Sequence, residues 1–316
     1  MVHRTPCKQS STLNERTGKN VWMKLENLQR TGSFKLRGAY NKISQLTDLE
    51  CKRGIIAASA GNHAQGVALA GREKGVKVTI FMPTTTPFAK VDATREYGAK
   101  VELVGETFDE AYQAACEHQK MTGATFVHPF DDMTIIEGQA TVALEMLQQN
   151  PQLDTIVVPA GGGGLLAGTA LAVKAIRPDV SVIGVQAAAA PAIASAFHGL
   201  DEKLIPFKAT IAEGIKVKSP GEYTSSIIKN YVDDMVTVSE VEIAEAILFM
   251  LEREKMLVEG AGAAGVAALL NHHITGKANQ VGVMVSGGNF DVIKLEHCRK
   301  IVEDNKRKLQ KQRAII

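Results

Sequence analysis

Short runs of apolar, mostly β-branched residues recur along the chain and alternate with longer segments of mixed apolar and polar residues. The short runs predict buried strands and the longer segments predict amphipathic helices. Strands are expected at 54–59, 77–83, 100–105, 154–160, 180–186, 235–239 and 280–286. Helices are expected at 61–75, 87–98, 109–120, 134–150, 165–176, 240–256 and 260–273.

Strands that alternate with helices predict an α/β fold built from parallel β-α-β units, with helices on both faces of each open sheet. The chain has 316 residues, which is enough for two lobes. Because no proline-rich or glycine/serine-rich linker divides it, we expect the chain to cross between the lobes directly.

The two ends of the chain depart from this rhythm. Residues 2–26 are expected to enter a strand early, with no helix before it. Residues 289–313 are highly charged and predict a solvated terminal helix. Only a weak apolar stripe runs along it: Ile293, Leu295, Cys298, Ile301 and Val302.

Composition excludes several classes of partner. The formal net charge of +2 is too small to indicate nucleic acid or an anionic membrane as the main partner. The four cysteines form no C-x-x-C pair, so reduced thiols in a cytoplasmic protein fit better than disulfides or a zinc site. No apolar run is long enough to span a bilayer, and no signal-peptide pattern is present.

The glycine cluster PAGGGGLLAG, at 159–168, follows a predicted strand and opens a predicted helix. Backbone N–H groups can approach an anion closely there, and the helix dipole favours negative charge, so a phosphate site is expected. The frame from Gly162 to Ala167 matches the dinucleotide fingerprint only loosely. The next strand ends in Gln186 rather than an acidic residue, and no Walker lysine is present, which disfavours NAD and ATP.

Two further clusters follow strands. ASAGNHAQG, at 58–66, places Ser59, Asn62, His63 and Gln65 beside free helix N–H groups and suits a carboxylate. The alternative is a simple capped helix with a packed histidine. MVSGGNFD, at 284–291, contributes Ser286. Since ligands bind beyond the carboxyl ends of parallel strands, all three clusters are expected to line one crevice.

The segment TGSFKLRGAY, at 31–40, contains the last candidate. By default, Lys35 and Arg37 would be a surface pair beside a turn. A phosphate site, a carboxylate site and this lysine together suggest pyridoxal phosphate acting on an amino acid, because lysine forms a Schiff base with that cofactor. Partial desolvation by Phe34 and the cofactor ring would lower the pKa of Lys35.

At these residues the chain resembles the serine/threonine dehydratase family of fold-type II pyridoxal-phosphate enzymes, most of all the threonine dehydratases. MKLENLQRTGSFKLRGA, ASAGNHAQG, GGGGLLAG and SGGN stand in the family's order, and the resemblance spans about residues 4 to 292. It implies the tryptophan synthase β-like fold, with two open, twisted, mostly parallel sheets. Residues 1–50 and 133–292 would form the large cofactor-binding domain and 54–132 the small domain, while 293–316 could be a linker to a regulatory domain.

The resemblance also implies a role for each candidate residue. Lys35 would bind the cofactor covalently and act as the base at the substrate Cα, with Phe34 against the pyridine ring. Asn62 would bond the 3′ oxygen, and Ser286 would face the pyridine nitrogen. The substrate carboxylate would meet Ser59, Ala60, Asn62 and His63. The phosphate would be held by the backbone of Gly161, Gly162, Gly163, Gly164 and Leu165.

The implied reaction is deamination of L-threonine to 2-oxobutanoate and ammonia, with L-serine giving pyruvate as a side activity, in isoleucine biosynthesis or threonine catabolism. A homodimer or homotetramer is implied, and no metal site is inferred because Gln186, Ala190 and Ala192 stand where some relatives carry cation ligands. Serine racemase or L-serine dehydratase is the nearest alternative, although racemases carry a serine where Ala60 stands. A β-replacement enzyme such as cysteine synthase and a non-catalytic nucleotide-binding regulator are more remote alternatives.

Overall fold

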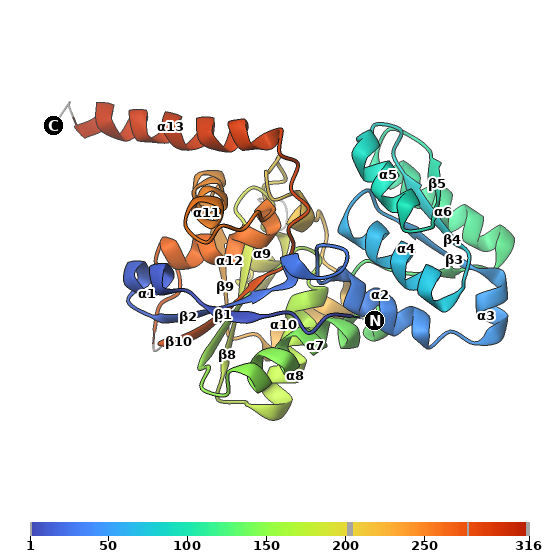
Figure 1. Ribbon diagram of the computed structural model, residues 1–316, viewed down its shortest axis with the longest axis horizontal. Coiled ribbons are helices and arrows are strands. Elements are labelled where there is room, and N and C mark those ends of the chain that lie inside the picture. The colour runs from blue at the N-terminus through green and yellow to red at the C-terminus, as the bar shows by residue number, and fades with distance from the viewer. Residues whose placement is uncertain (1, 201–204, 277, 314–316) are drawn as a thin grey trace.

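The computed structural model describes residues 2–200, 205–276 and 278–313, and it contains two separate sheets, each covered by helices (Figure 1). The larger sheet has six strands in the order β1-β2-β10-β7-β8-β9. Its strands are β1 (Cys7–Gln9), β2 (Asn20–Leu25), β7 (Thr155–Pro159), β8 (Ser181–Ala187), β9 (Asp234–Val238) and β10 (Gln280–Val285). All neighbours pair in parallel except β1 with β2.

Both faces of the larger sheet are buried, which explains its continuous apolar runs. In β7, Ile156 and Val158 face one hydrophobic cluster while Val157 between them faces another. Helices α7 (Met133–Gln149) and α8 (Gly164–Ile176) cover the first face. Helices α11 (Glu240–Glu252) and α12 (Gly260–Leu270) cover the second.

The smaller sheet has four parallel strands in the order β5-β4-β3-β6. They are β3 (Ile55–Ala58), β4 (Val78–Met82), β5 (Lys100–Leu103) and β6 (Thr125–Phe126). Helices α4 (Asn62–Lys74) and α6 (Phe108–Thr122) contribute to the clusters on its two faces. The two mostly parallel sheets confirm the predicted fold class, whereas the domain limits at 50, 54 and 132 stay predictions.

Helix α2 (Lys35–Ser44) lies between the two parts of the molecule (Figure 1). It packs on α4 of the smaller part and on α7 of the larger part. Its residues Leu36, Ala39 and Ile43 are fully buried in the cluster under the smaller sheet. The remaining elements are α3 (Asp48–Arg53), α5 (Phe88–Glu96), α9 (Ala192–Phe197), α10 (Glu222–Tyr231) and the short 3-10 helices η1 (Glu26–Leu28) and η3 (Glu213–Ile215).

The ends of the chain differ from expectation. Helix α1 (Ser11–Thr17) separates β1 from β2, capped by Ser10 and ended by Gly18 in the left-handed conformation, so the prediction of a strand without a preceding helix was wrong for β2. Helix α13 (Lys294–Arg313) is largely exposed, as predicted, but Cys298 and Val302 are buried against the core cluster that contains α11. The tail is therefore docked on the fold. Within the described ranges, no helix combines the length and apolarity needed to cross a membrane.

Candidate active site

Lys35 is the first residue of α2, and contacts with the end of β10 fix where that helix begins. The backbone N–H of Phe34 donates to the carbonyl of Ser286 at 3.1 Å. Ser33 pairs with Gly287 as an isolated antiparallel bridge. These contacts bring the lysine segment and the SGGN segment together, although they are about 250 residues apart in sequence. The default interpretation of Lys35 and Arg37 as a surface pair was wrong.

The Lys35 side chain is partly enclosed. Its Nζ donates to the carbonyl of Pro129 at 2.6 Å and lies 5.3 Å from the centroid of the Phe34 ring. Burial lowers the pKa of Lys35 to about 8, and the nearby charge of Glu259 opposes the shift. The amine can therefore lose its proton near neutral pH, which a Schiff-base lysine must do.

The glycine loop closes tightly on its surroundings. A β-carbon on Gly161 would lie 2.9 Å from the Cα of Ile215, and one on Gly162 would lie 2.3 Å from the Phe130 ring. Gly163 has φ +92°, in the left-handed region that disfavours side chains. Helix α8 begins at Gly164, and no side chain caps that start in the described part of the chain. The N–H groups of Gly164 and Leu165 therefore remain available to an anion.

Two side chains donate hydrogen bonds to carbonyl groups of the glycine loop. The hydroxyl of Thr224 donates to the carbonyl of Gly162 at 2.8 Å. Gln186 Nε2 donates to the carbonyl of Gly161 at 3.4 Å, while its Oε1 accepts from the N–H of Ala194 at 2.8 Å. In the sequence, Gln186 stood out because it occupies a position where an acidic residue would be expected in a dinucleotide site or in some relatives' cation site. In the structure it links the loop to α9.

Asn62 lies at the start of α4 with both ends of its amide engaged. Its Nδ2 donates to Glu259 Oε1 at 2.7 Å, and its Oδ1 accepts from Asn289 Nδ2 at 2.7 Å. A β-carbon on Gly287 would lie only 2.3 Å from Glu259 Oε1, so the cluster MVSGGNFD packs directly on this carboxylate. Since the amide nitrogen has two protons, one stays free for a ligand.

Glu259 was missed by sequence reasoning. It precedes the first residue of α12, and burial raises its pKa to about 7. A signal existed, because one acidic residue stands at the edge of the small-residue run GAGAAG. An acidic residue directly before a helix is also favoured by the helix dipole, so this signal by itself did not identify the partner of Glu259.

The side chains predicted to form the carboxylate site have different surroundings. Ser59 Oγ accepts from the N–H of Gly61 at 3.2 Å, and Ala60 follows it at the mouth of the turn, half-buried. The His63 ring points into the core, where its Nε2 bonds the carbonyl of Val127 at 2.8 Å. A carbonyl only accepts, so this nitrogen holds the proton. The backbone N–H groups at the start of α4 therefore remain for a carboxylate, while the imidazole is occupied elsewhere.

Burial pushes the ionisable groups of the site toward their neutral forms. It lowers the pKa of His63 to about 3, with the Lys35 charge contributing. It also lowers the pKa of His128, where Asp131 opposes the shift. The lowered pKa of Lys35 and the raised pKa of Glu259 have the same cause, since burial disfavours the charged form of each. Such a site favours a ligand that brings its own charges to the two helix starts.

The structure thus gathers the predicted residues around one place. Lys35 reaches the Pro129 carbonyl, and the adjacent Phe130 ring packs on Gly162 of the loop. Asn62 bonds Glu259, and Glu259 packs on Gly287. The neighbouring Ser286 bonds the backbone of Phe34, which directly precedes the lysine. A glycine loop at a helix start fits a phosphate, and a partly buried lysine fits an aldehyde. The residues present therefore fit pyridoxal phosphate.

Comparison with known proteins agrees with this chemistry. The family model of the pyridoxal-phosphate-dependent enzymes matches residues 1–287, and the chain belongs to that family.

Individual relatives are more specific. The L-threonine ammonia-lyase of Thermotoga maritima is 53% identical over 293 residues, which cover 92% of this chain and 73% of that protein. Among solved structures, the processed form of threonine deaminase isoform 2 from Solanum lycopersicum superposes with a TM-score of 0.89 at 37% identity, covering 96% of this chain and 84% of the other. The serine racemase of Dictyostelium discoideum superposes with a TM-score of 0.86 at 35% identity, covering 92% and 94%.

Proposed function

We propose that this chain deaminates L-threonine to 2-oxobutanoate and ammonia, using pyridoxal phosphate, with L-serine as a second substrate. The observation that carries the proposal is the placement of Lys35, whose amine lies 2.6 Å from Pro129 while the next residue, Phe130, packs on the glycine loop. The similarity to the L-threonine ammonia-lyase of Thermotoga maritima supports the choice of substrate.

Each part of the site has a task in this proposal. The bound cofactor supplies an electron sink for negative charge at the substrate Cα. The start of α8 would hold the phosphate through backbone N–H groups and the helix dipole, and Thr224 and Gln186 keep its loop in place. Asn62, fixed by Glu259 and Asn289, would offer its second amide proton to the cofactor oxygen.

Lys35 serves both as the covalent anchor and as the base at Cα. Its pKa of about 8 allows a neutral amine at physiological pH, and a neutral amine is needed to accept a proton. Ser286 would face the pyridine nitrogen of the bound cofactor in this assignment. Because a hydroxyl is far less acidic than a carboxylic acid, it would leave that nitrogen unprotonated, which would favour elimination over other reactions of the cofactor.

Racemisation is the alternative that a specific comparison favours, because the serine racemase of Dictyostelium discoideum shares the fold. Racemisation needs an acid on each face of Cα, and Lys35 can serve only one face. Ala60, beside Ser59 at the start of α4, has a methyl group that cannot donate a proton. Deamination of L-substrates is therefore the better supported activity.

The setting of the enzyme is also proposed. The four free cysteines support a reducing compartment, and we expect the cytoplasm. We expect a homodimer or homotetramer, which sedimentation analysis would settle.

The proposal is tested by adding L-threonine to the purified holoenzyme and measuring 2-oxobutanoate and ammonia in equal amounts. Lys35→Ala is the negative control, since it removes anchor and base together. L-serine should give pyruvate more slowly, and D-threonine should give nothing. If the protein holds the cofactor on Lys35 but forms no 2-oxo acid from either L-amino acid, the proposed reaction is wrong.

A further inference from the structure

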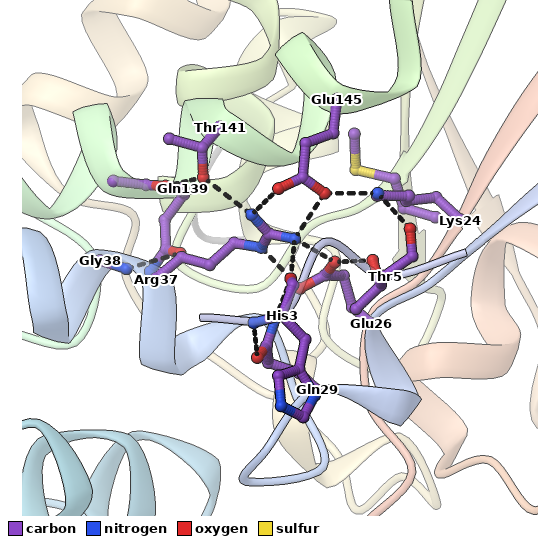
Figure 2. A network of polar contacts seen from close by, with 12 residues as sticks. His3, Thr5, Lys24, Glu26, Gln29, Arg37, Gly38, Gln139, Thr141 and Glu145 are labelled. Carbon is purple, nitrogen blue, oxygen red and sulfur yellow. Dashed lines mark hydrogen bonds and ion pairs between the residues drawn. The ribbon is translucent and has the colours of Figure 1, made fainter. Parts of the chain in front are cut away.

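Four charged side chains form a buried cluster behind the helix that carries Lys35 (Figure 2). They are Lys24 from β2, Glu26 from η1, Arg37 from α2 and Glu145 from α7. Lys24 and Glu26 are 0% exposed and Arg37 is 2% exposed. Two cations meet two anions, so the cluster is formally neutral.

The guanidinium of Arg37 is held by a carboxylate on either side. Its Nε and Nη2 each donate to Glu26 at 2.8 Å. Its Nη1 and Nη2 donate to Glu145 at 2.7 and 2.9 Å. Nη1 also donates to the Thr141 hydroxyl at 3.1 Å, and one of the two Nη2 protons is shared with the His3 carbonyl at 3.2 Å. All five N–H protons have acceptors, so the plane of the group has one orientation.

The two carboxylates are themselves held. Lys24 Nζ donates to Glu145 at 2.6 Å and to the carbonyl of Thr5 at 2.8 Å. The hydroxyl of Thr5 donates to Glu26. Figure 2 shows these contacts joining the start of the chain, β2, α2 and α7 in one network. Lys24, Glu26 and Arg37 are buried, and the Glu145 side chain is 17% exposed. Burying charges is costly, and well-packed apolar residues commonly stabilise a core as well or better, so stability alone is a weak explanation for the cluster.

The position of Arg37 suggests another role. It stands two residues after Lys35, in the first turn of α2. The next residue, Gly38, meets α7 so closely that a β-carbon on Gly138 would lie 2.6 Å from the Gly38 Cα. The N–H of Gly38 also donates to Gln139 Oε1 at 3.1 Å. The contact between Gly38 and Gly138 sets the distance between α2 and α7. The guanidinium of Arg37 then fixes the rotation of the first turn of α2, which carries the Lys35 side chain.

We propose that Arg37 is a positioning residue, which acts through Glu26 and Glu145 to hold the first turn of α2 so that the Lys35 amine stays in its enclosed place beside Pro129. This inference rests on the function proposed for Lys35. Arg37 itself does not reach the site. A guanidinium is required, because it can bind two carboxylates edge-on at once, whereas an ammonium binds as a point charge and leaves the turn free to rotate.

The test is Arg37→Lys, which keeps the positive charge but cannot form paired hydrogen bonds to Glu26 and Glu145 at the same time. Arg177→Lys is the matched control, because Arg177 pairs with Asp179 through Nε and Nη2 at 2.9 and 2.6 Å on the surface. Met250→Ala, a fully buried site in α11, controls for a loss of stability alone. The holoenzymes are assayed with L-threonine. In protein freed of cofactor, acylation of Lys35 is followed against pH by mass spectrometry.

In Arg37→Lys we expect kcat to fall about 10- to 100-fold while KM changes less than about twofold, because misplacing a catalytic group mainly affects the reaction step. The acylation midpoint of Lys35 should rise from its value near 8 toward the ordinary lysine range, since a looser amine is better solvated. Both controls should keep the wild-type midpoint. Glu259, His63 and His128 are the charged or titratable neighbours of this amine, and no variant changes them.

Should Arg37→Lys fail to fold, Thr141→Val carries the same test, since it removes one acceptor of the guanidinium and no charge. It should shift the midpoint in the same direction by less, and Thr141→Ser should restore it. A midpoint and kcat equal to those of Arg177→Lys in the folded variants would overturn the proposal. Because the acylation midpoint needs no substrate, a failed threonine assay with a shifted midpoint would count against the proposed reaction rather than against this role.

Discussion

The amide of Asn62 donates to the carboxylate of Glu259 at 2.7 Å, across 197 positions of sequence. This bond joins the start of α4, which packs on the smaller sheet, to the start of α12, which packs on the larger one. Glu259 also packs on Gly287, so one carboxylate contacts two of the three glycine-containing clusters. The site therefore depends on a residue that lies in none of them.

Glu259 should make stability depend on pH. Burial raises its pKa from 4.5 in the unfolded chain to about 7, so the folded protein binds a proton there that the unfolded chain releases. The contribution is fully present below about pH 4.5 and is lost as pH rises through about 7. Glu259→Gln cannot ionise and still accepts from Asn62. In cofactor-free protein, the Tm of Glu259→Gln minus the Tm of wild type should therefore increase as the pH rises from 5 to 8.

The control for this measurement is Glu96→Gln, at an exposed position in α5, whose Tm should follow wild type across the range. A constant difference in Tm between Glu259→Gln and wild type from pH 5 to 8 would show that Glu259 is already ionised in the fold.

The glycine loop should be sensitive to a single methyl group. Gly162→Ala would place a β-carbon 2.3 Å from the Phe130 ring, so the loop or the ring must move. Overpacking of this kind costs about 1–3 kcal/mol, and we expect cofactor Kd to rise about 10-fold or more. Gly18→Ala is the control, because Gly18 has φ +69° but no heavy atom within 4 Å of the added carbon. Equal cofactor Kd in the two variants would exclude a tight loop.

The fold followed from the sequence because its strands are buried on both faces. Runs such as IVVP and VGVMV are apolar at every position, which is typical of parallel sheets, and β7 and β10 lie where these runs predict them. Helix α1 was missed because STLNERT has a single buried residue, Leu13, so no apolar stripe marks it.

The site was predictable where local geometry carries the chemistry. Gly161 to Gly164 stand at a strand end in the sequence and in the structure. Glu259 and Gln186 could not be found in that way, because their roles depend on partners distant in sequence. His63 was placed with the substrate on sequence grounds, yet its ring bonds Val127, since a histidine in the first turn of a buried helix can face either way.

The C-terminal helix should matter for stability only in its first half. Cys298 and Val302 are buried at 0% and 6% exposure, whereas residues from Glu303 onward are mostly exposed. Val302→Ala should lower the free energy of unfolding by about 1–3 kcal/mol. Ending the chain after residue 304 should change Tm by little more than experimental error, and ending it after residue 293 should lower Tm clearly. Equal Tm for both truncations would mean that the helix is not docked.

Ala60 should decide between elimination and racemisation. In the proposed function, Ala60→Ser would add a hydroxyl on the face of the substrate Cα opposite to Lys35. We expect the variant to form D-serine from L-serine at a measurable rate, while wild type forms almost none, as followed by chiral chromatography. Ala60→Gly, which adds no proton donor, is the control. Substantial D-serine from the wild-type protein would contradict the assignment of this residue.

The central claim is that Lys35 holds pyridoxal phosphate. Borohydride fixes a lysine-bound cofactor as a stable secondary amine, and peptide mass spectrometry then locates it. The account predicts one phosphopyridoxyl group per chain, on Lys35 of the peptide containing TGSFKLRGAY, and none in Lys35→Ala. If another lysine, such as Lys24 or Lys90, carried the label and Lys35 did not, Lys35 would not be the residue that binds the cofactor.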